Sequence, residues 1–393
     1  MRFKGVRPVG VLSAAGELVL RRRYFWGKGA GGCYPCDEKA GIAASAVTAG
    51  ARELCCVMGL ASDFRAAAAN LRRVGGLGVC PERLRQVVEA EGARAAALRD
   101  AGLVPAAWSA GADDLEKGRL YVGVDGLLVR AVTQAEKDKR RRAHATHRRL
   151  RGRRAVKNLR PLPPPRPGAD QSFKEVKFAV FYDQPKTRRH ALATAGEGAE
   201  LGRLLRLHAG QVGIDHARQA LGLTDGAAWI ARQLEVNLPM LTARILDFYH
   251  LASHVHEAAR ACLGEGTPQA AAWAYARLHE VKHAGPAPVL AAVAALNERV
   301  RAPAKRESLR GLRHYVAERA EAGMLDYPGA RRRGWDIGSG PTEAAGKNLA
   351  LRVRGVGMKW DPRHAADMMN LKALYESGQA PHYWARAAET CPN

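Results

Sequence analysis

The stretch Leu120-Tyr-Val-Gly-Val-Asp-Gly126 is an apolar run that ends in a carboxylate. Its Val and Tyr content predicts a buried strand over residues 118–132, in which Asp125 stands at the end of the apolar run. Burying an unpaired carboxylate costs several kcal/mol, so Asp125 needs a partner, and a divalent cation is a good one. A second interpretation stays open, because Asp-Gly between two apolar segments is also a favoured hairpin turn.

Two further carboxylates stand in comparable places. Asp225 ends the run Leu221-Gly-Leu-Thr-Asp-Gly226, and Glu343 ends Gly338-Ser-Gly-Pro-Thr-Glu343, where a helix is expected to start. Each also has an ordinary interpretation: Asp225 as a helix N-cap, and Glu343 as the i,i+4 ion-pair partner of Lys347. Together the three carboxylates favour a site for two Mg²⁺ ions about 4 Å apart, the arrangement that promotes phosphodiester cleavage or transfer.

The charge of the chain indicates the class of partner. Its 393 residues include 62 Lys and Arg against 38 Asp and Glu, a net charge of +24. Such an excess favours a polyanion, because basic side chains release counterions from phosphates. Ribosomal and membrane-surface proteins share this property, so charge sets only the class. Seven Cys, no evident signal peptide and no apolar run of membrane-spanning length predict a reduced, cytoplasmic setting without a membrane.

The order of patterns predicts an α/β protein with a helical insertion. We expect a small Gly-rich module over 1–50, helices over 51–117, an α/β core over 118–255, a helical insertion over 256–330, and C-terminal core helices over 331–393. Core strands are expected at 176–182, 188–194, 221–225 and 241–246, and core helices at 197–219, 226–234 and 249–262.

Within 51–117, a helical repeat of apolar residues stops at Gly75-Gly-Leu-Gly78 and resumes after Pro81. Helix, tight turn and helix are typical of a helix-turn-helix DNA-binding unit, and equally of any αα-hairpin.

A basic, Pro-rich insertion is expected over 133–172. Residues 137–160 hold twelve Lys and Arg and one acid, Asp138, and a Pro-rich run follows. This composition cannot pack a core and predicts a mobile loop or arm, either a solvated linker or a contact to phosphates. The arginines concerned are Arg140, Arg141, Arg142, Arg148 and Arg149.

Two further groups of ligand-type residues are weaker signals. Asp247 and His250 stand three apart where a strand changes to a helix, so they can share a face and reach each other. An Asp that caps the helix beside a paired His is the alternative. Cys33-x2-Cys36 lacks a second pair at zinc-ribbon spacing.

The order of these motifs resembles bacterial insertion-sequence transposases with an RNase H-like DDE core, and is most similar to the Kra-type group and the wider Mutator-like superfamily. The resemblance covers most of the chain and rests on Tyr121-Val-Gly-Val-Asp125-Gly, Thr224-Asp225-Gly-Ala-Ala-Trp229, Asp247-Phe-Tyr-His250 and Gly338-Ser-Gly-Pro-Thr-Glu343. The chain departs from the family near its N-terminus, where the expected upstream thiols are absent and Cys36 occupies a Leu position. The first module is therefore expected to be a degenerate zinc-ribbon-like unit.

The resemblance implies a division of roles. Asp125, Asp225 and Glu343 would be catalytic and hold two Mg²⁺ ions, with Mn²⁺ as a substitute. Asp247 and His250 would support the site or contact DNA near the cleaved bond. Asp225 is favoured over Asp247 as the second ligand because small residues follow it and leave room for metal and DNA.

The resemblance also implies the partners. DNA, as terminal inverted repeats and as target, would be bound by a homodimer or larger assembly in the nucleoid. Contacts to phosphates are expected from Lys347, Arg352, Arg354 and Lys359, and Trp360 would either stack on an unpaired base or be a core residue. Two alternatives remain: a nuclease or resolvase without strand transfer, and a decayed or domesticated DNA-binding protein without activity.

Overall fold

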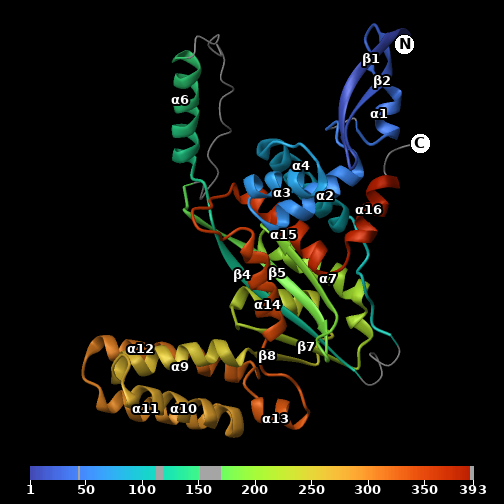
Figure 1. The fold of residues 1–393 in the computed structure, drawn as a ribbon. Helices are drawn as coiled ribbons and strands as arrows, with labels where there is room; N and C mark the ends of the chain where they lie inside the picture. The colour runs from blue at the N-terminus through green and yellow to red at the C-terminus, as the bar shows by residue number, and fades with distance from the viewer. Residues whose placement is uncertain (43–44, 112–117, 151–169, 390–393) are drawn as a thin grey trace.

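The computed structural model describes residues 1–42, 45–111, 118–150 and 170–389. It is a mixed α/β structure around a five-stranded sheet. Figure 1 shows this sheet at the centre, a helical layer beside one of its ends, and a bundle of long helices beside the other. Among the described residues, no helix is both long and apolar enough to cross a membrane.

The central sheet is mixed, and each of its expected strands is present. Its strands are β4 (Arg119–Arg130), β5 (Phe173–Asp183), β6 (Arg189–Thr194), β7 (Gln219–Thr224) and β8 (Ala243–Leu246). They are ordered β6-β5-β4-β7-β8. The β4–β5 and β5–β6 pairs are antiparallel, whereas β4–β7 and β7–β8 are parallel. The central strand β4 therefore has an antiparallel neighbour on one side and a parallel neighbour on the other.

Alternation along β4 assigns its side chains to the two faces of the sheet. Leu120, Val122 and Val124 belong to the buried cluster that includes α7 (Gly198–Val212) and α8 (Ala228–Asn237). Tyr121 belongs to the cluster on the opposite face. Gly123 and Asp125 are two and four residues after Tyr121 in the strand, so they lie on the same face as Tyr121.

The helices on the Tyr121 face come from the C-terminal part of the chain. They are α14 (Gly340–Leu351), which packs on β4 and β5, and α15 (Pro362–Glu376), which packs on β6 and β5; α16 (Ala380–Glu389) follows. The expected helical insertion is a bundle of α9 (Phe248–Leu263), α10 (Pro268–Ala284), α11 (Ala287–Arg299) and α12 (Pro303–Glu321), with α13 (Tyr327–Arg332) packed on α10.

The N-terminal part holds a small sheet and a helical layer. The sheet consists of β1 (Arg2–Ser13), β2 (Gly16–Gly27) and β3 (Gly31–Cys33), followed by α1 (Pro35–Lys39), on which Cys36 is exposed. The layer consists of α2 (Ala49–Ala61), α3 (Phe64–Gly75) and α4 (Pro81–Asp100), and α4 packs on α15. The predicted helix, Gly turn and helix is confirmed as α3 and α4, with Gly76 in the left-handed conformation at φ 65°.

Asp125 does not end its strand, and Asp-Gly is not a turn. Strand β4 continues to Arg130, with Asp125 opposite Phe178 and Gly126 opposite Lys177 on β5. The buried Leu127 and Val129 extend the apolar alternation past Asp125. Pairing with the long strand β5 thus overrides the local turn signal.

Residues 137–150 are helical rather than a loop. They belong to α6 (Gln134–Leu150), which projects from the body of the molecule in Figure 1. Lys, Arg, Gln and Ala are good helix formers, so a segment without an apolar face can still be helical. Its first turn is anchored by the ion pairs Lys137–Asp361 and Glu136–Lys359. Residues 151–169 of the predicted insertion lie outside the described residues.

The helix expected over 197–219 is shorter. It ends at Val212 because Gly213 takes the left-handed conformation, with φ 82°, at the C-cap. A 3₁₀ turn over Ile214–His216 then leads into β7.

Candidate metal centre

Asp125 and Asp225 are brought together by the register of two parallel strands. Val124 of β4 is opposite Thr224, the last residue of β7. Asp125 and Asp225 are therefore the next residues on two neighbouring strands, which lie about 4.8 Å apart where they are paired. Beyond this point β4 continues while β7 has ended, so Asp125 lies beside an uncovered part of the sheet.

Glu343 reaches Asp125 because α14 packs unusually close to β4. A Cβ atom on Gly123 would overlap the hydroxyl of Thr342, and a Cβ on Gly346 would lie 2.8 Å from the ring of Phe178. The two missing side chains let the helix lie directly on the sheet. Glu343, next to Thr342 in the first turn of α14, is thereby placed near Asp125.

His250 completes the group from a third segment. It lies in the first turn of α9, which begins immediately after β8. Its Nε2 is 3.8 Å from Oε1 of Glu343. Ligand atoms of Asp125, His250 and Glu343 all lie within 4.8 Å of one another. Two carboxylates and one imidazole at this spacing are a suitable donor set for one divalent cation.

The electrostatics of the group also suit a cation. The pKa of Asp125 is raised to about 6, mainly by burial; the charges of Asp225 and Glu343 also raise it, whereas the Gly126 N–H and His250 lower it. Carboxylates that oppose each other's ionisation gain when a positive ion is bound between them. The described partners of Glu343 are His250 and Lys347, whose Nζ is 4.0 Å from Oε2.

Asp225 lies near this group but is not part of it. Its charge raises the pKa of Asp125, yet the cluster within 4.8 Å contains His250 in its place. Asp225 Oδ1 accepts a hydrogen bond from the Ala227 N–H at 2.9 Å; because Ala227 is itself the N-cap of α8, this bond belongs to the turn before the helix, and Asp225 is not the N-cap. The structure thus places the three predicted carboxylates in one region, with Asp225 outside the ligand cluster.

Asp247 joins the segments that carry His250 and Glu343. It is buried at the N-cap of α9, where Oδ1 accepts from the N–H groups of Tyr249 and His250. Oδ2 accepts from the N–H of Ser339, just before α14. Its own N–H donates to the carbonyl of Thr224 at the end of β7. Both oxygens are occupied, so Asp247 positions the site, and its paired partner is the backbone of His250 rather than the imidazole.

Sequence reasoning missed the contribution of the bundle. Tyr315 on α12 donates to the carbonyl of Asp225 at 3.1 Å, and Arg319 donates to the carbonyl of Gly226 at 2.9 Å. The guanidinium of Arg319 lies 3.8 Å from the centre of the Tyr315 ring. The insertion therefore fixes the backbone around Asp225. These contacts join residues about 90 positions apart, and no local pattern marks them.

Two of the residues expected to contact DNA are buried. Arg352 is 4% exposed, donates from Nε to the carbonyl of Gly59, and stacks over the rings of Phe64 and Trp360. Burial lowers the pKa of Arg352 to about 10. Trp360 is 8% exposed and joins the end of β4 by a backbone bridge to Ala131. Their burial contradicts the predicted DNA contacts and favours the interpretation of Trp360 as a core residue.

The other predicted contacts are on or near the surface. Lys347 and Arg354 are exposed, and Arg354 donates to the carbonyl of Leu128. Lys359 forms the ion pair with Glu136 at the base of α6. Arg140 and Arg142 are exposed on α6 and Arg141 is half-buried, whereas the side chains of Arg148 and Arg149 lie outside the described residues.

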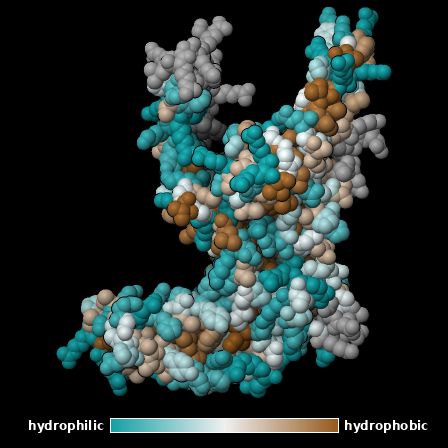
Figure 2. Space-filling model, in the orientation of Figure 1, coloured by the Kyte–Doolittle hydropathy of each residue, from teal (hydrophilic) through white to brown (hydrophobic). Residues whose placement is uncertain are grey.

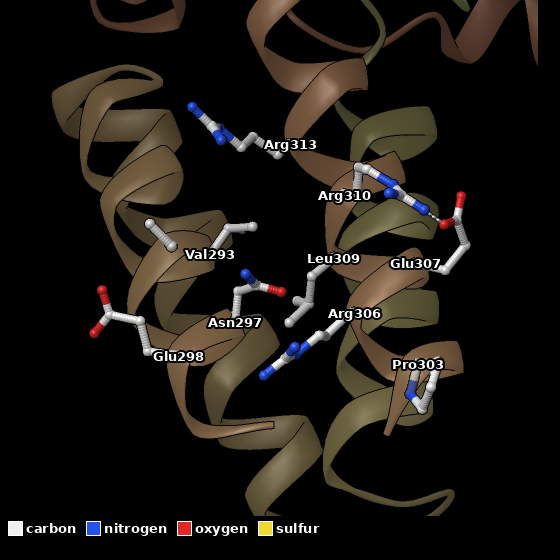
Figure 3. Close-up of a pocket in the computed structure, with 10 residues that line it drawn as sticks. Val293, Asn297, Glu298, Pro303, Arg306, Glu307, Leu309, Arg310 and Arg313 are labelled. Atoms are coloured by element: carbon white, nitrogen blue, oxygen red, sulfur yellow. Dashed lines mark ion pairs between the residues drawn. The ribbon is translucent and has the colours of Figure 1, made fainter. Parts of the chain in front are cut away.

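A cavity of about 520 Å³ lies away from the carboxylates, between α11 and α12 of the bundle (Figure 3). Arg306 and Arg313 extend toward α11, while Arg310 turns away to pair with Glu307. Arg306 is also held by the carbonyl of Val300. The cavity shares no lining residue with the candidate metal centre.

No family model and no curated protein matches this chain.

Proposed function

We propose that the chain is a metal-dependent DNA transposase with an RNase H-like DDE core, of the bacterial insertion-sequence type and most similar to the Kra-type group. One observation carries the proposal. Asp125 and Asp225 occupy successive positions on neighbouring parallel strands, and Glu343 approaches them from a helix packed on the same face. The strand order β6-β5-β4-β7-β8, with two antiparallel and two parallel pairs, supports the RNase H-like assignment.

The residues present fit a divalent cation. Asp125, Glu343 and His250 would hold one ion, and Asp225, whose charge acts on Asp125, would take part in a second. When bound, such ions supply charge stabilisation for in-line displacement at a phosphodiester. Carboxylates suit Mg²⁺, and the imidazole adds affinity for Mn²⁺. Asp247 would hold the first turns of α9 and α14 in place while DNA binds.

The net charge of +24 supports DNA as the substrate. Water would attack at the transposon end and expose a 3′-hydroxyl, which would then attack target DNA. Exposed cations near the carboxylates, among them Lys347 on α14 and Arg354 after it, would bind backbone phosphates.

The test is cleavage of a plasmid that carries the DNA flanking the gene, with Mg²⁺ or Mn²⁺. We expect Asp125→Asn to abolish cleavage and to leave DNA binding intact. The matched control is Asp215→Asn, which removes a carboxylate paired with Arg206 on another part of the surface, and should cleave normally. A wild-type chain that cleaves with neither metal would refute the enzymatic proposal and leave a DNA-binding protein.

A second assay separates transposase from nuclease. Pre-cleaved ends with free 3′-hydroxyls are incubated with a target plasmid and a divalent metal. Joined products support strand transfer, whereas cleavage in the first assay without joining in the second identifies a nuclease or resolvase.

A further inference from the structure

The small N-terminal sheet is a long, narrow ribbon that projects from the body of the molecule. Strands β1 and β2 have twelve residues each and pair antiparallel along their length, and β3 adds three residues at one end. At about 3.4 Å per residue these strands are roughly 40 Å long. Figures 1 and 2 show the ribbon and α6 both extending beyond the helical layer at the same end of the molecule, with a wide gap between them.

The ribbon is strongly basic. Residues 2–33 contain seven Lys and Arg and one acid, Glu17, which gives a local charge of 7 − 1 = +6. Two of the arginines are engaged: Arg22 pairs with Asp37, and Arg7 lies over the ring of Tyr24. The other five have no ion-pair partner among the side chains that the structure describes; they are Arg2, Lys4, Arg21, Arg23 and Lys28.

One face of the ribbon is open. Side chains directly opposite each other on antiparallel strands share a face, so Arg23 lies with Val6, and Arg21 with Pro8. All four are exposed, as is Val19 on the same face. The other face carries Arg22 and is covered near α1, where Asp37 and Tyr34 contact it. The open face therefore presents two unpaired guanidinium groups between small apolar side chains.

A second copy of the chain is a poor occupant for this surface. Edge-to-edge pairing of two β1 strands would bring together two ribbons of charge +6, which repel each other. The strand is also blunted as an edge, because its register shifts between Phe3 and Val6 and it contains Lys4 and Pro8. Charge complementarity favours a polyanion instead.

We propose that the β1–β2 ribbon is a DNA-binding element that enters the major groove of a duplex. The major groove is about 12 Å wide and admits a two-stranded β-ribbon. Arg21 and Arg23 would contact phosphates or base edges, and Val6 and Val19 would lie against the groove, where thymine methyl groups are available. The inference rests on the proposed function in taking DNA as the polyanion, and it assigns DNA contacts outside the helix-turn-helix-like α3 and α4.

The test is a DNA-binding measurement on the full chain without metal. Binding is measured from the fluorescence anisotropy of a short labelled duplex at several salt concentrations. The variant is Arg21→Gln with Arg23→Gln. The control, Arg232→Gln with Arg299→Gln, removes the same charge from exposed positions on α8 and α11. Unchanged thermal unfolding shows that each variant is folded.

Each phosphate contact contributes about 0.9 to the slope of log affinity against log salt, so the ribbon variant should lose about 1.8 from the slope and bind about tenfold or more weakly at 0.1 M salt. The control should keep nearly the wild-type slope. Equal losses in both variants, or no loss in the ribbon variant, would overturn the proposal. A loss confined to an RNA duplex would overturn it in favour of RNA.

Groove choice is tested by competition. Methyl green, which occupies the major groove, should displace the wild type, and distamycin, which occupies the minor groove, should not; the reverse would overturn the major-groove assignment. The binding test contains no metal and so does not depend on cleavage. If the ribbon binds DNA but the plasmid assay shows no cleavage, the proposed function is refuted and the proposal about the ribbon is not.

Discussion

Replacing Asp247 with Asn should destabilise the protein far more than an isosteric change usually does. Asp247 is 1% exposed and accepts three backbone N–H groups, from Tyr249 at 2.6 Å, His250 at 3.2 Å and Ser339 at 2.5 Å. An Asn oxygen can keep the first two. Its NH₂ group then faces the Ser339 N–H, donor against donor.

The magnitude follows from this loss. A hydrogen bond to a charged group contributes about 1.5–3 kcal/mol, and the unsatisfied buried donor adds to its loss, so we expect about 2–4 kcal/mol for Asp247→Asn. Asp247→Ala also removes the helix cap, which is worth about 1–2 kcal/mol, and should cost about 3–6 kcal/mol in total. Urea unfolding, monitored by tryptophan fluorescence, measures the stability loss in both variants.

Asp63→Asn is the matched control. Asp63 caps α3 by accepting from the N–H groups of Arg65 and Ala66, but it is exposed and has no third donor among the residues that the structure describes. Since Asn and Asp are nearly equivalent N-caps, this change should leave the free energy of unfolding nearly unchanged. A cost for Asp247→Asn no larger than that of the control would refute the reasoning. Mn²⁺ affinity should also fall about 10–100-fold in Asp247→Asn, because the residue positions both His250 and Glu343.

Three further outcomes are expected. Mn²⁺ affinity measured by calorimetry should fall at least about tenfold from pH 7 to pH 5, because Asp125, with a pKa raised to about 6, must lose its proton to bind a cation; a flat profile would count against the site. Burial lowers the pKa of both His190 and His208, so below about pH 6.5 the unfolded chain binds protons that the folded chain does not. Stability should therefore be nearly full above about pH 7 and fall as the pH drops, by on the order of 4 kcal/mol at pH 5 for the two groups together, and by about half as much in His208→Leu. Gly123→Ala should cost about 1–3 kcal/mol in urea unfolding through overlap with Thr342, and less in a Thr342→Ala background; equal costs in the two backgrounds would exclude this contact as the cause.

The sequence predicted the strands and most helices because their signals are local. The buried strand β7 is an apolar run, and α9 begins after Asp247 as its capping pattern indicates. Local signals left alternatives open where a distant partner decides the conformation. Asp125-Gly126 has the composition of a turn, but it is held in β4 by pairing with residues of β5 some fifty positions away.

The candidate site was predicted in its carboxylates and not in its grouping. Asp125 and Glu343 were predicted from local motifs. The position of His250 depends instead on the rotation of α9 about its axis, which is fixed by the hydrogen bond between Asp247 and Ser339. The local sequence does not indicate the burial of Arg352 either. A basic residue after a helix resembles a surface cation until Phe64 and Trp360 are known to enclose it.

The candidate metal-ligand group is assembled from three segments that meet at the end of β7. The carbonyl of Thr224 accepts from the N–H of Asp247, and Asp247 in turn binds the N–H of Ser339, so one short chain of hydrogen bonds joins β7, α9 and α14. Asp225, the residue after Thr224, is not part of this series of hydrogen bonds; its carbonyl accepts instead from Tyr315 of the bundle. The three residues of the cluster are thus positioned by the sheet and its adjoining helix ends, while the backbone at Asp225 is held by the helical bundle. That division explains why Asp225 lies beside the cluster rather than within it.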